Sequence, residues 1–280
     1  MGARAEFFEH AGARLYAVIH PAEASRGVGV AIVHPFMEER QDSHPVLRSL
    51  AERLAREGYP SIRFDLTGCG DSWGDWSDGT VARWLDDIEG ACARLREAAG
   101  VTDVALVGLR FGATLSALAA PRVGAAALAM VQPVVKGAQY AMDLLRANLA
   151  AEMVLNKKAN ITREVLIERL GRGESVNIFG YDFTPAQWEG LQPIDLAADL
   201  ARYDGPLMLL DVVRTPTAGG SNELRRLAAT LGERASLRRA VEAQPLYTEG
   251  KVRLARSVSV EDEIVQWLAD ALRERSTPRG

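Results

Sequence analysis

The sequence predicts an α/β protein with a doubly wound, mostly parallel sheet. Short apolar runs rich in β-branched residues alternate with longer segments of helical periodicity along most of the 280 residues. Such alternation is typical of parallel strands joined by helices that cover both faces of a sheet. Hydrophobic residues make up 48% of the chain, which is enough for the core of one large domain or of a domain with an insertion.

The expected elements of the first half follow in a regular order. Alternating residues over 6–19 predict a hairpin or an irregular pair of strands, and a β-branched run over 27–36 predicts a central strand with a Pro-containing exit. Leucines at helical spacing over 43–59 predict a helix that ends near Gly58. There follow a strand over 60–66, a loop rich in Gly, Asp and Ser over 67–79, a helix over 80–100, and a strand over 104–107 with a helix after it.

The alternation breaks after a strand predicted over 126–134. Residues 136–195 predict two or three amphipathic helices and a short polar segment, 174–188. We interpret them as a helical cap over the carboxyl ends of the strands, with ordinary packing helices as the alternative. The core then resumes with a strand over 206–213, a helix over 221–232, a strand over 237–247 and a helix over 259–275. The predicted organisation is a core in two parts, 1–135 and 196–280, around a cap, 136–195.

Charge and composition exclude several classes of partner. The formal net charge is −4 and no Lys/Arg run is present, so we expect no binding to nucleic acid or to anionic membranes. No window approaches the roughly 18 apolar residues of a membrane helix, and the first residues include acidic ones, so we expect a cytoplasmic protein without a membrane span. Cys69 and Cys92 lack a CxxC or His-rich setting, and we expect neither a metal nor a cofactor.

One stretch, GLRFGA at residues 108–113, follows a buried strand and opens a helix. This strand, turn and helix resemble the nucleophile elbow of α/β-hydrolases, G-x-S-x-G, in which a serine stands at the tip of a sharp turn. Here the tip is Arg110. A guanidinium stays charged and has no lone pair to offer, so it cannot attack a carbonyl group.

Five motifs carry a more specific resemblance. In chain order they are HPFMEERQDS, DLTGCGDSWGDW, GLRFGA, QPVVKGAQY and FGYDFTPAQ, spread over residues 30–193. They are similar to the successive motifs of the exosortase A system-associated hydrolases, type 2, which also carry arginine at the elbow. The resemblance implies an α/β-hydrolase-like fold with a helical cap insertion. It also implies a setting in exopolysaccharide or protein-sorting loci, and a related protein of another biosynthetic cluster is the alternative.

The residues of a serine triad are missing. In α/β-hydrolases the histidine comes last in the chain, whereas His10, His20, His34 and His44 all lie in the first sixth of this sequence. We therefore expect no ordinary serine-hydrolase chemistry. Asp211, at the usual place of the acid, has no histidine to orient and is interpreted as structural.

The same residues predict an anion-handling site. Arg110 at a helix N-terminus would add its charge to backbone N–H groups suited to a carboxylate, a phosphate or a developing oxyanion. Glu38 and Glu39 follow the strand whose exit loop forms part of the oxyanion hole, and one of them could have a raised pKa and act as general base. His34, beside the same loop, is a further candidate base. The alternative is a structural Arg110–Glu39 salt bridge that fills a silent site.

The motifs supply further candidates. Four of their residues are assigned to substrate binding: Phe36, Cys69, Phe111 and Gln132. Trp73, Trp76 and Trp84 are expected to form a hydrophobic seam beneath the cap.

Two functions remain open. In the first, the protein is an atypical enzyme that acts on an acyl ester, thioester or other carboxyl-derived substrate, with water or a second substrate as the attacking group. In the second, it is a catalytically silent protein that binds an acyl or anionic ligand or a partner enzyme. Either function predicts a small-molecule acyl or carboxylate ligand, free or carrier-bound, and the chain could form a homodimer.

Overall fold

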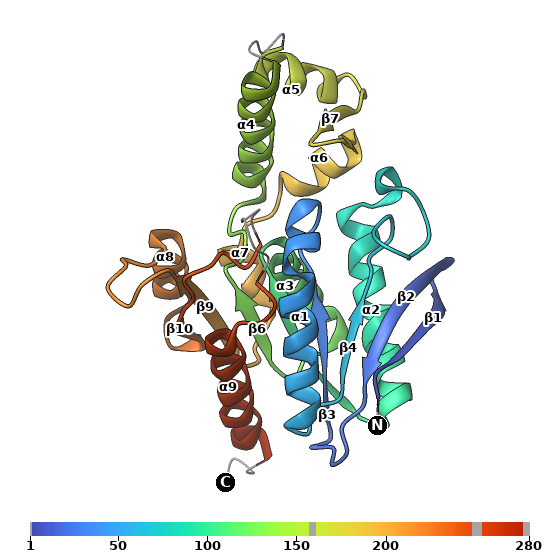
Figure 1. Cartoon of the computed structure of the whole chain (residues 1–280), viewed down its shortest axis with the longest axis vertical. Coiled ribbons are helices and arrows are strands. Elements are labelled where there is room, and N and C mark those ends of the chain that lie inside the picture. The colour runs from blue at the N-terminus through green and yellow to red at the C-terminus, as the bar shows by residue number, and fades with distance from the viewer. Residues whose placement is uncertain (1, 157–160, 248–253, 277–280) are drawn as a thin grey trace.

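One twisted sheet organises the molecule (Figure 1). The structure is a computed structural model that describes residues 2–156, 161–247 and 254–276. Within these residues the sheet has eight strands in the order β1-β2-β4-β3-β5-β6-β9-β10. Their bounds are β1 Arg4–His10, β2 Ala13–His20, β3 Val28–Val33, β4 Ser61–Phe64, β5 Asp103–Leu109, β6 Leu128–Val131, β9 Leu207–Val213 and β10 Ala235–Val241.

The strand directions confirm the predicted doubly wound, mostly parallel sheet. Within the described part of this eight-stranded sheet, the antiparallel pairs are those of β2, with β1 on one side and β4 on the other. From β4 to β10 every neighbouring pair is parallel. The predicted hairpin over 6–19 is the β1–β2 pair, whose register joins His10 to Ala13.

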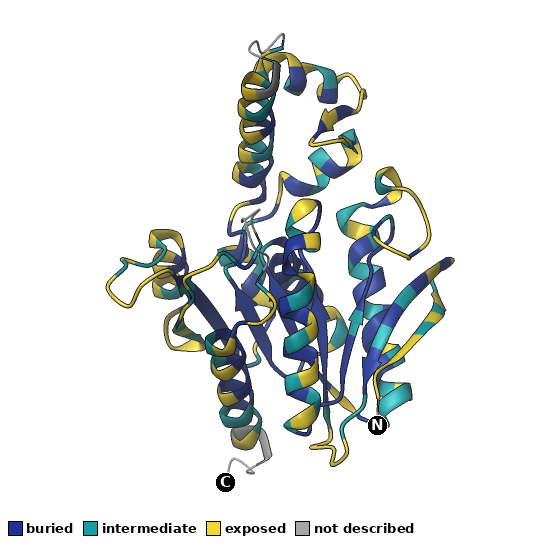
Figure 2. Ribbon diagram, in the orientation of Figure 1, coloured by how far each residue is buried: buried dark blue, intermediate teal, exposed yellow. Residues whose placement is uncertain are grey.

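Helices cover both faces of the sheet, as the alternation of segments predicted. One apolar core lies between the sheet and α1 (Glu38–Arg56) with α9 (Val258–Ser276). The other lies between the sheet and α2 (Val81–Ala99), α3 (Phe111–Val123) and α8 (Asn222–Leu231). Figure 2 shows the central strands buried between these layers and the outer helix surfaces exposed.

Two predicted boundaries were wrong. Helix α1 begins at Glu38, five residues before the leucine periodicity starts, because its first turn is polar and Pro45 interrupts the sequence pattern without ending the helix. Glu38 and Glu39 therefore lie in a helical turn and not in a loop. The last strand, β10, ends at Val241 and not near residue 247.

Between β6 and β9 the chain leaves the sheet and forms a separate layer, which we call the helical insertion. It contains α4 (Gly137–Asn156), α5 (Arg163–Gly171), the antiparallel strands β7 (Val176–Ile178) and β8 (Tyr181–Phe183), and α6 (Pro185–Leu191). Figure 1 shows it beyond the end of the sheet from which α1 starts. Short helical turns, α7 (Leu196–Asp199) and the 3₁₀ turn Leu200–Arg202, lead the chain back to β9.

Close backbone packing holds the turn between β5 and α3. A Cβ atom added at Gly112 would lie 2.3 Å from the carbonyl oxygen of His34 and 2.4 Å from that of Val33. Both distances are far shorter than a van der Waals contact, and the two oxygens belong to the backbone, which cannot move aside as a flexible side chain could. The exit of β3 and the start of α3 can therefore touch only because residue 112 has no side chain.

We predict that Gly112→Ala lowers the free energy of unfolding by about 3 kcal/mol, at the upper end of the usual cost of overpacking, because rigid backbone would have to move. Urea denaturation measures this loss. Gly171→Ala is the matched control, since an added Cβ there meets no atom within 4 Å, and its stability should stay within about 0.5 kcal/mol of the wild type. A Gly112→Ala protein as stable as the control would contradict the proposed packing constraint.

Candidate active site

The elbow places Arg110 at the junction of β5 and α3 in a strained conformation. Its backbone has φ 54° and ψ −124°, a combination that non-glycine residues rarely adopt. The Arg110 N–H donates to the carbonyl of Val131 at 2.9 Å, which ties the turn to β6. Phe111 is the first residue of α3, so its backbone N–H has no acceptor within the helix. The turn thus has the geometry of a nucleophile elbow with a guanidinium at its tip.

Three groups surround the Arg110 guanidinium. Its Nε donates to Oε1 of Glu39 at 3.1 Å, and its Nη1 donates to the carbonyl of Gln132 at 3.4 Å. The ring of Tyr247 lies against it, with 4.6 Å between the guanidinium carbon and the ring centroid. The ion pair with Glu39 is a single contact through Nε and not a bidentate pair. The guanidinium therefore keeps N–H groups that the carboxylate does not use.

The Glu39 carboxyl group is under opposing electrostatic influences. Burial raises its pKa above the usual range, and the Arg110 charge reverses this only in part. Its second oxygen, Oε2, is buried and has no hydrogen-bond partner. For Arg110, burial is the largest single influence and lowers the pKa, but Glu39, Tyr247 and Tyr140 together outweigh it and the net direction is upward. The site thus combines a permanent cation with a carboxylate that is a stronger base than usual.

Aromatic rings build the floor beneath this pair. Phe36 packs edge-on against Phe111 with ring centroids 4.7 Å apart, and Phe111 stacks on Tyr140 at 5.7 Å. Trp84 and Trp76 also contact Phe36, as expected for a hydrophobic seam. Trp73 does not take part and is 54% exposed, so its assignment to the seam was wrong. Asp75 and Asp78 cap the turn after Trp73, and this loop leaves its ring in solvent.

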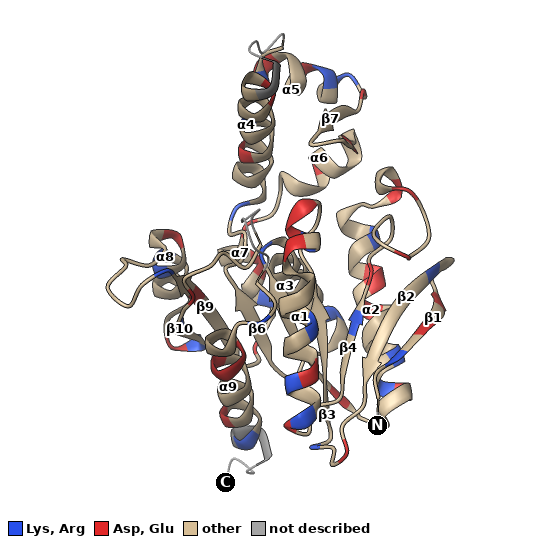
Figure 3. Cartoon of the chain, viewed as in Figure 1, with Lys and Arg blue, Asp and Glu red and all other residues tan. Residues whose placement is uncertain are grey.

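A cavity of about 830 Å³ lies between the start of α1 and the helical insertion. Its aromatic lining residues are Phe36, Tyr140, Phe179 and Tyr247, and its acidic ones include Glu38 and Glu39. Asn148 of α4 fixes the far wall, because its side chain accepts from the Phe179 N–H at 2.9 Å and donates to the Asn177 carbonyl at 3.3 Å. Figure 3 shows the acidic first turn of α1 directed toward the insertion, whose α4 carries few charges.

The predicted catalytic residues are partly brought together. Arg110 and Glu39 are in contact, and Glu38 lines the cavity beside them. His34 lines a different pocket, between β2, β4 and α1. Its Nδ1 donates to the Pro35 carbonyl at 2.5 Å and its Nε2 accepts from the Leu66 N–H at 3.4 Å, so both ring nitrogens are occupied.

The four residues assigned to substrate binding are spread over different surroundings. Phe36 lines the cavity, whereas Phe111 is fully buried beneath it. Gln132 contacts Arg110 through its carbonyl, while its side-chain amide donates to the Val212 carbonyl at 3.2 Å. Cys69 is buried, and burial raises the pKa of its thiol to about 12, which leaves it a protonated thiol at neutral pH.

Sequence reasoning missed two tyrosines of the site, Tyr140 and Tyr247. Tyr140 stands in the QPVVKGAQY motif at the start of α4, and burial raises its pKa well above the usual range, so it stays a neutral phenol. Tyr247 lies between β10 and α9, the segment that carries the late histidine in the α/β-hydrolase order. That topological position is a signal that could have singled it out.

Among the described residues no group of three or more His, Cys, Asp or Glu side chains is placed to hold a metal ion. Those same parts of the chain contain no helix with both the length and the apolar character needed to cross a bilayer.

Comparison with known proteins defines the fold class. No known protein family matches the sequence, and no curated protein matches it. Solved structures do match: the ferulic acid complex of Est1E from Butyrivibrio proteoclasticus aligns with a TM-score of 0.68 and 17% identity, over 96% of this chain and 99% of that chain. The α/β hydrolase GrgF from Penicillium sp. sh18 gives 0.64 and 16% over 98% and 99%. An esterase from Pyrococcus furiosus gives 0.61 and 14% over 97% and 91%. The chain therefore has the α/β-hydrolase fold.

We predict that buried His34 makes stability fall in mild acid. Burial lowers its pKa to about 4, whereas the unfolded chain has a histidine pKa near 6.5. Between these values the unfolded state binds the proton and the folded state does not, so this stabilisation is complete above about pH 6.5 and lost toward pH 4. The full effect is roughly 3 kcal/mol. Urea unfolding of wild type and His34→Gln across this range measures it, and equal pH slopes in the two proteins would contradict it.

Proposed function

We propose that the protein hydrolyses an acyl ester, thioester or related carboxyl derivative at an Arg110–Glu39 site without a covalent serine intermediate. The observation that carries the proposal is the arrangement of this pair. The guanidinium stands at the elbow position, and the carboxylate beside it has a raised pKa and one oxygen, Oε2, without a hydrogen bond. A positioned cation and a base with a free lone pair are the two groups that water-driven acyl hydrolysis needs.

The reaction can be written with these groups alone. Glu39 accepts a proton from water as the water oxygen bonds to the acyl carbon, and the carbonyl oxygen becomes an oxyanion. The Arg110 guanidinium and the Phe111 N–H stabilise that negative charge. The bond from carbon to the ester oxygen or thioester sulfur then breaks. Glu39 returns the proton to the leaving group and is a carboxylate again, so one water is consumed and an acid and an alcohol or thiol are released.

The lining of the cavity favours a substrate whose acyl group is apolar or aromatic. Phe36, Tyr140, Phe179 and Tyr247 border it, and Leu144 and Ala147 of α4 add apolar surface. The Est1E complex holds ferulic acid, a carboxylic acid whose organic body includes an aromatic ring, in a protein of the same fold. We therefore propose aromatic and medium-length aliphatic acyl groups, free or carrier-bound, as ligands.

We also propose that residues 136–195 serve as the cap over this cavity and that residues 1–135 and 196–280 form the core.

A silent, ligand-binding protein is the second candidate. It is favoured by the absence of a nucleophile at the elbow and by the ion pair that occupies the site. In that case the cavity would bind an acyl or anionic ligand, or a partner enzyme, without turnover.

We further infer that the protein is cytoplasmic and is related to the exosortase A system-associated hydrolases, type 2. The five ordered motifs support that relation, and gel filtration would test the homodimer that we also consider.

We predict that the purified protein hydrolyses members of a panel of feruloyl, aromatic and aliphatic acyl esters and thioesters. Arg110→Ala and Glu39→Gln should each lower kcat/KM at least about 100-fold, because each removes a group that acts in the transition state. Arg122→Ala and Glu97→Gln, exposed positions on α3 and α2, are the matched controls and should change it less than twofold.

The outcomes separate the two functions. Wild-type turnover that both site variants retain would reject the Arg110–Glu39 mechanism. No turnover with any substrate, together with saturable binding of ferulate that Arg110→Ala abolishes, would establish the silent binder and reject the enzyme. Calorimetry measures that binding on the same protein samples.

A further inference from the structure

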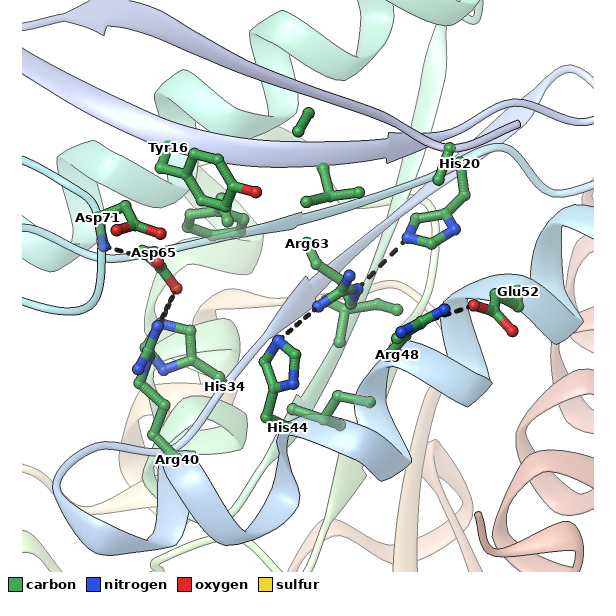
Figure 4. Close-up of a pocket in the computed structure, with 16 residues that line it drawn as sticks. Tyr16, His20, His34, Arg40, His44, Arg48, Glu52, Arg63, Asp65 and Asp71 are labelled. Carbon is green, nitrogen blue, oxygen red and sulfur yellow. Dashed lines mark hydrogen bonds and ion pairs between the residues drawn. The ribbon is translucent and has the colours of Figure 1, made fainter. Parts of the chain in front are cut away.

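A second, polar pocket lies on the other side of α1 from the cavity beneath the helical insertion. It has a volume of about 400 Å³ and is lined by β2, β3, β4 and α1. Figure 4 shows its side chains: two histidines flank a central arginine, and further arginines stand on α1. No residue assigned to the acyl site other than His34 lines this pocket.

The sequence places these side chains on two facing surfaces. Arg40, His44, Arg48 and Glu52 recur every four residues and so share one face of α1. Tyr16 and His20 share one face of β2, because they are separated by an even number of residues. Arg63 of β4 lies between the two surfaces. Polar residues at every fourth position of a helix that packs against a strand are thus the sequence signal for this pocket.

Of the three arginines that line this pocket, Arg63 is the one without an ion pair to a described residue. Its Nε donates to Nε2 of His20 at 3.4 Å and its Nη1 to Nε2 of His44 at 3.3 Å. Among the described residues no carboxylate lies within 4 Å of it. By contrast, Arg40 pairs with Asp65 at 2.5 Å and Arg48 with Glu52 at 2.9 Å. Burial, followed by the like charge of Arg48, lowers the pKa of Arg63, and the more distant charges of Asp65 and Glu52 oppose this only in part.

The two histidines hold the Arg63 guanidinium by accepting its hydrogen bonds. Since a guanidinium only donates, Nε2 of His20 and of His44 must accept, and each ring then carries its proton on Nδ1. Burial lowers the pKa of both rings, that of His20 to about 4, so both are neutral at pH 7. The Tyr16 hydroxyl is directed toward the middle of the cluster (Figure 4). The donors left for a ligand at Arg63 are three of its own N–H groups and the Tyr16 phenol.

The acidic lining residues do not supply the missing charge. Oδ1 of Asp65 accepts from Arg40, and its Oδ2 accepts from the Asp71 N–H at 3.0 Å. Oε1 of Glu52 accepts from Arg48, and the Asp71 side chain lies at the exposed edge of the pocket. The unpaired charge and the free donors therefore remain at Arg63.

We propose that this pocket binds a phosphate monoester of a small organic molecule, with the phosphate on Arg63. Arg63 of β4, the Tyr16 hydroxyl of β2 and the Arg48 N–H groups of α1 that Glu52 does not use offer more donors than the two oxygens of a carboxylate need, which suits a phosphate. Arginine also presents a fork that matches phosphate oxygens. The volume exceeds what inorganic phosphate would fill, and Val18, Ile32, Leu47 and Phe64 offer an apolar wall for the organic group. The proposal does not depend on acyl hydrolysis at Arg110.

Calorimetric titration of the full chain with phenyl phosphate tests the proposal. We expect one site, with the affinity lowered at least about tenfold in Arg63→Gln, because a charge-assisted, bidentate contact is lost. His44→Ala, on the partly exposed face of α1, should also weaken binding. Arg53→Gln is the matched control, an arginine of α1 that pairs with Glu57 and Asp262 outside the pocket, and it should bind as the wild type does. Circular dichroism verifies the folding of each variant.

Further titrations identify the ligand and the site. Arg110→Ala should retain phenyl phosphate binding within about twofold; loss in this variant would mean that the anion binds at the elbow, and the proposal would fail. Benzoate that binds as tightly as phenyl phosphate would overturn the assignment to phosphates. If inorganic phosphate bound as tightly as phenyl phosphate, the assignment of an organic phosphate ester as the ligand would be wrong. Equal affinity of wild type, Arg63→Gln and His44→Ala would overturn the site itself.

Discussion

The close approach of the β3 exit to the start of α3 is the constraint on which the Arg110–Glu39 site depends. Because Gly112 lets α3 touch the carbonyl groups of Val33 and His34, the first turns of α1 and α3 are held next to each other. Each of these helices is preceded by a strained residue, Met37 with φ 54° and Arg110 with φ 54°. Strain of this kind persists only where the surrounding structure determines it. Here the sheet register and the backbone packing do so, and they bring Glu39 to Arg110.

The Arg110–Glu39 ion pair compensates the buried charge of the guanidinium but leaves part of the carboxylate without a partner. An unpaired guanidinium in this position would be costly, and Glu39, with Tyr247 over the charge, provides compensation. The pair is not saturated, since it has one contact and leaves Oε2 without a partner. The amino end of α1 favours the ionised carboxylate through its dipole, whereas burial disfavours it. A group held between these influences can exchange a proton more easily than one in a bidentate, solvated pair.

Sequence reasoning reached the fold and the central pair but not the surroundings of the pair. The mostly parallel sheet follows from the alternation of strands and helices, and the elbow position of Arg110 follows from two glycines that bracket a turn, because both are local patterns. Tyr247 could not be placed in the same way, since its contact with Arg110 joins residues far apart in the chain through the packing of the β10–α9 connection. Glu39 was assigned to a loop because helix propensity does not show that a polar turn before Pro45 is helical.

The start of α1 also explains how one short segment supplies two unlike pockets. Successive residues of a helix point about 100° apart, so Glu39 and Arg40 must face different sides. Glu39 therefore reaches the elbow, while Arg40 and, one turn later, His44 face β2 and β4. Carboxylates are concentrated on the side where Arg110 already supplies the cation. The other side has three arginines and three carboxylates, and Arg63 is the one of these arginines without an ion pair to a described residue. The two proposed sites therefore differ in how their arginine is compensated: Arg110 has a carboxylate, and Arg63 has two neutral imidazoles.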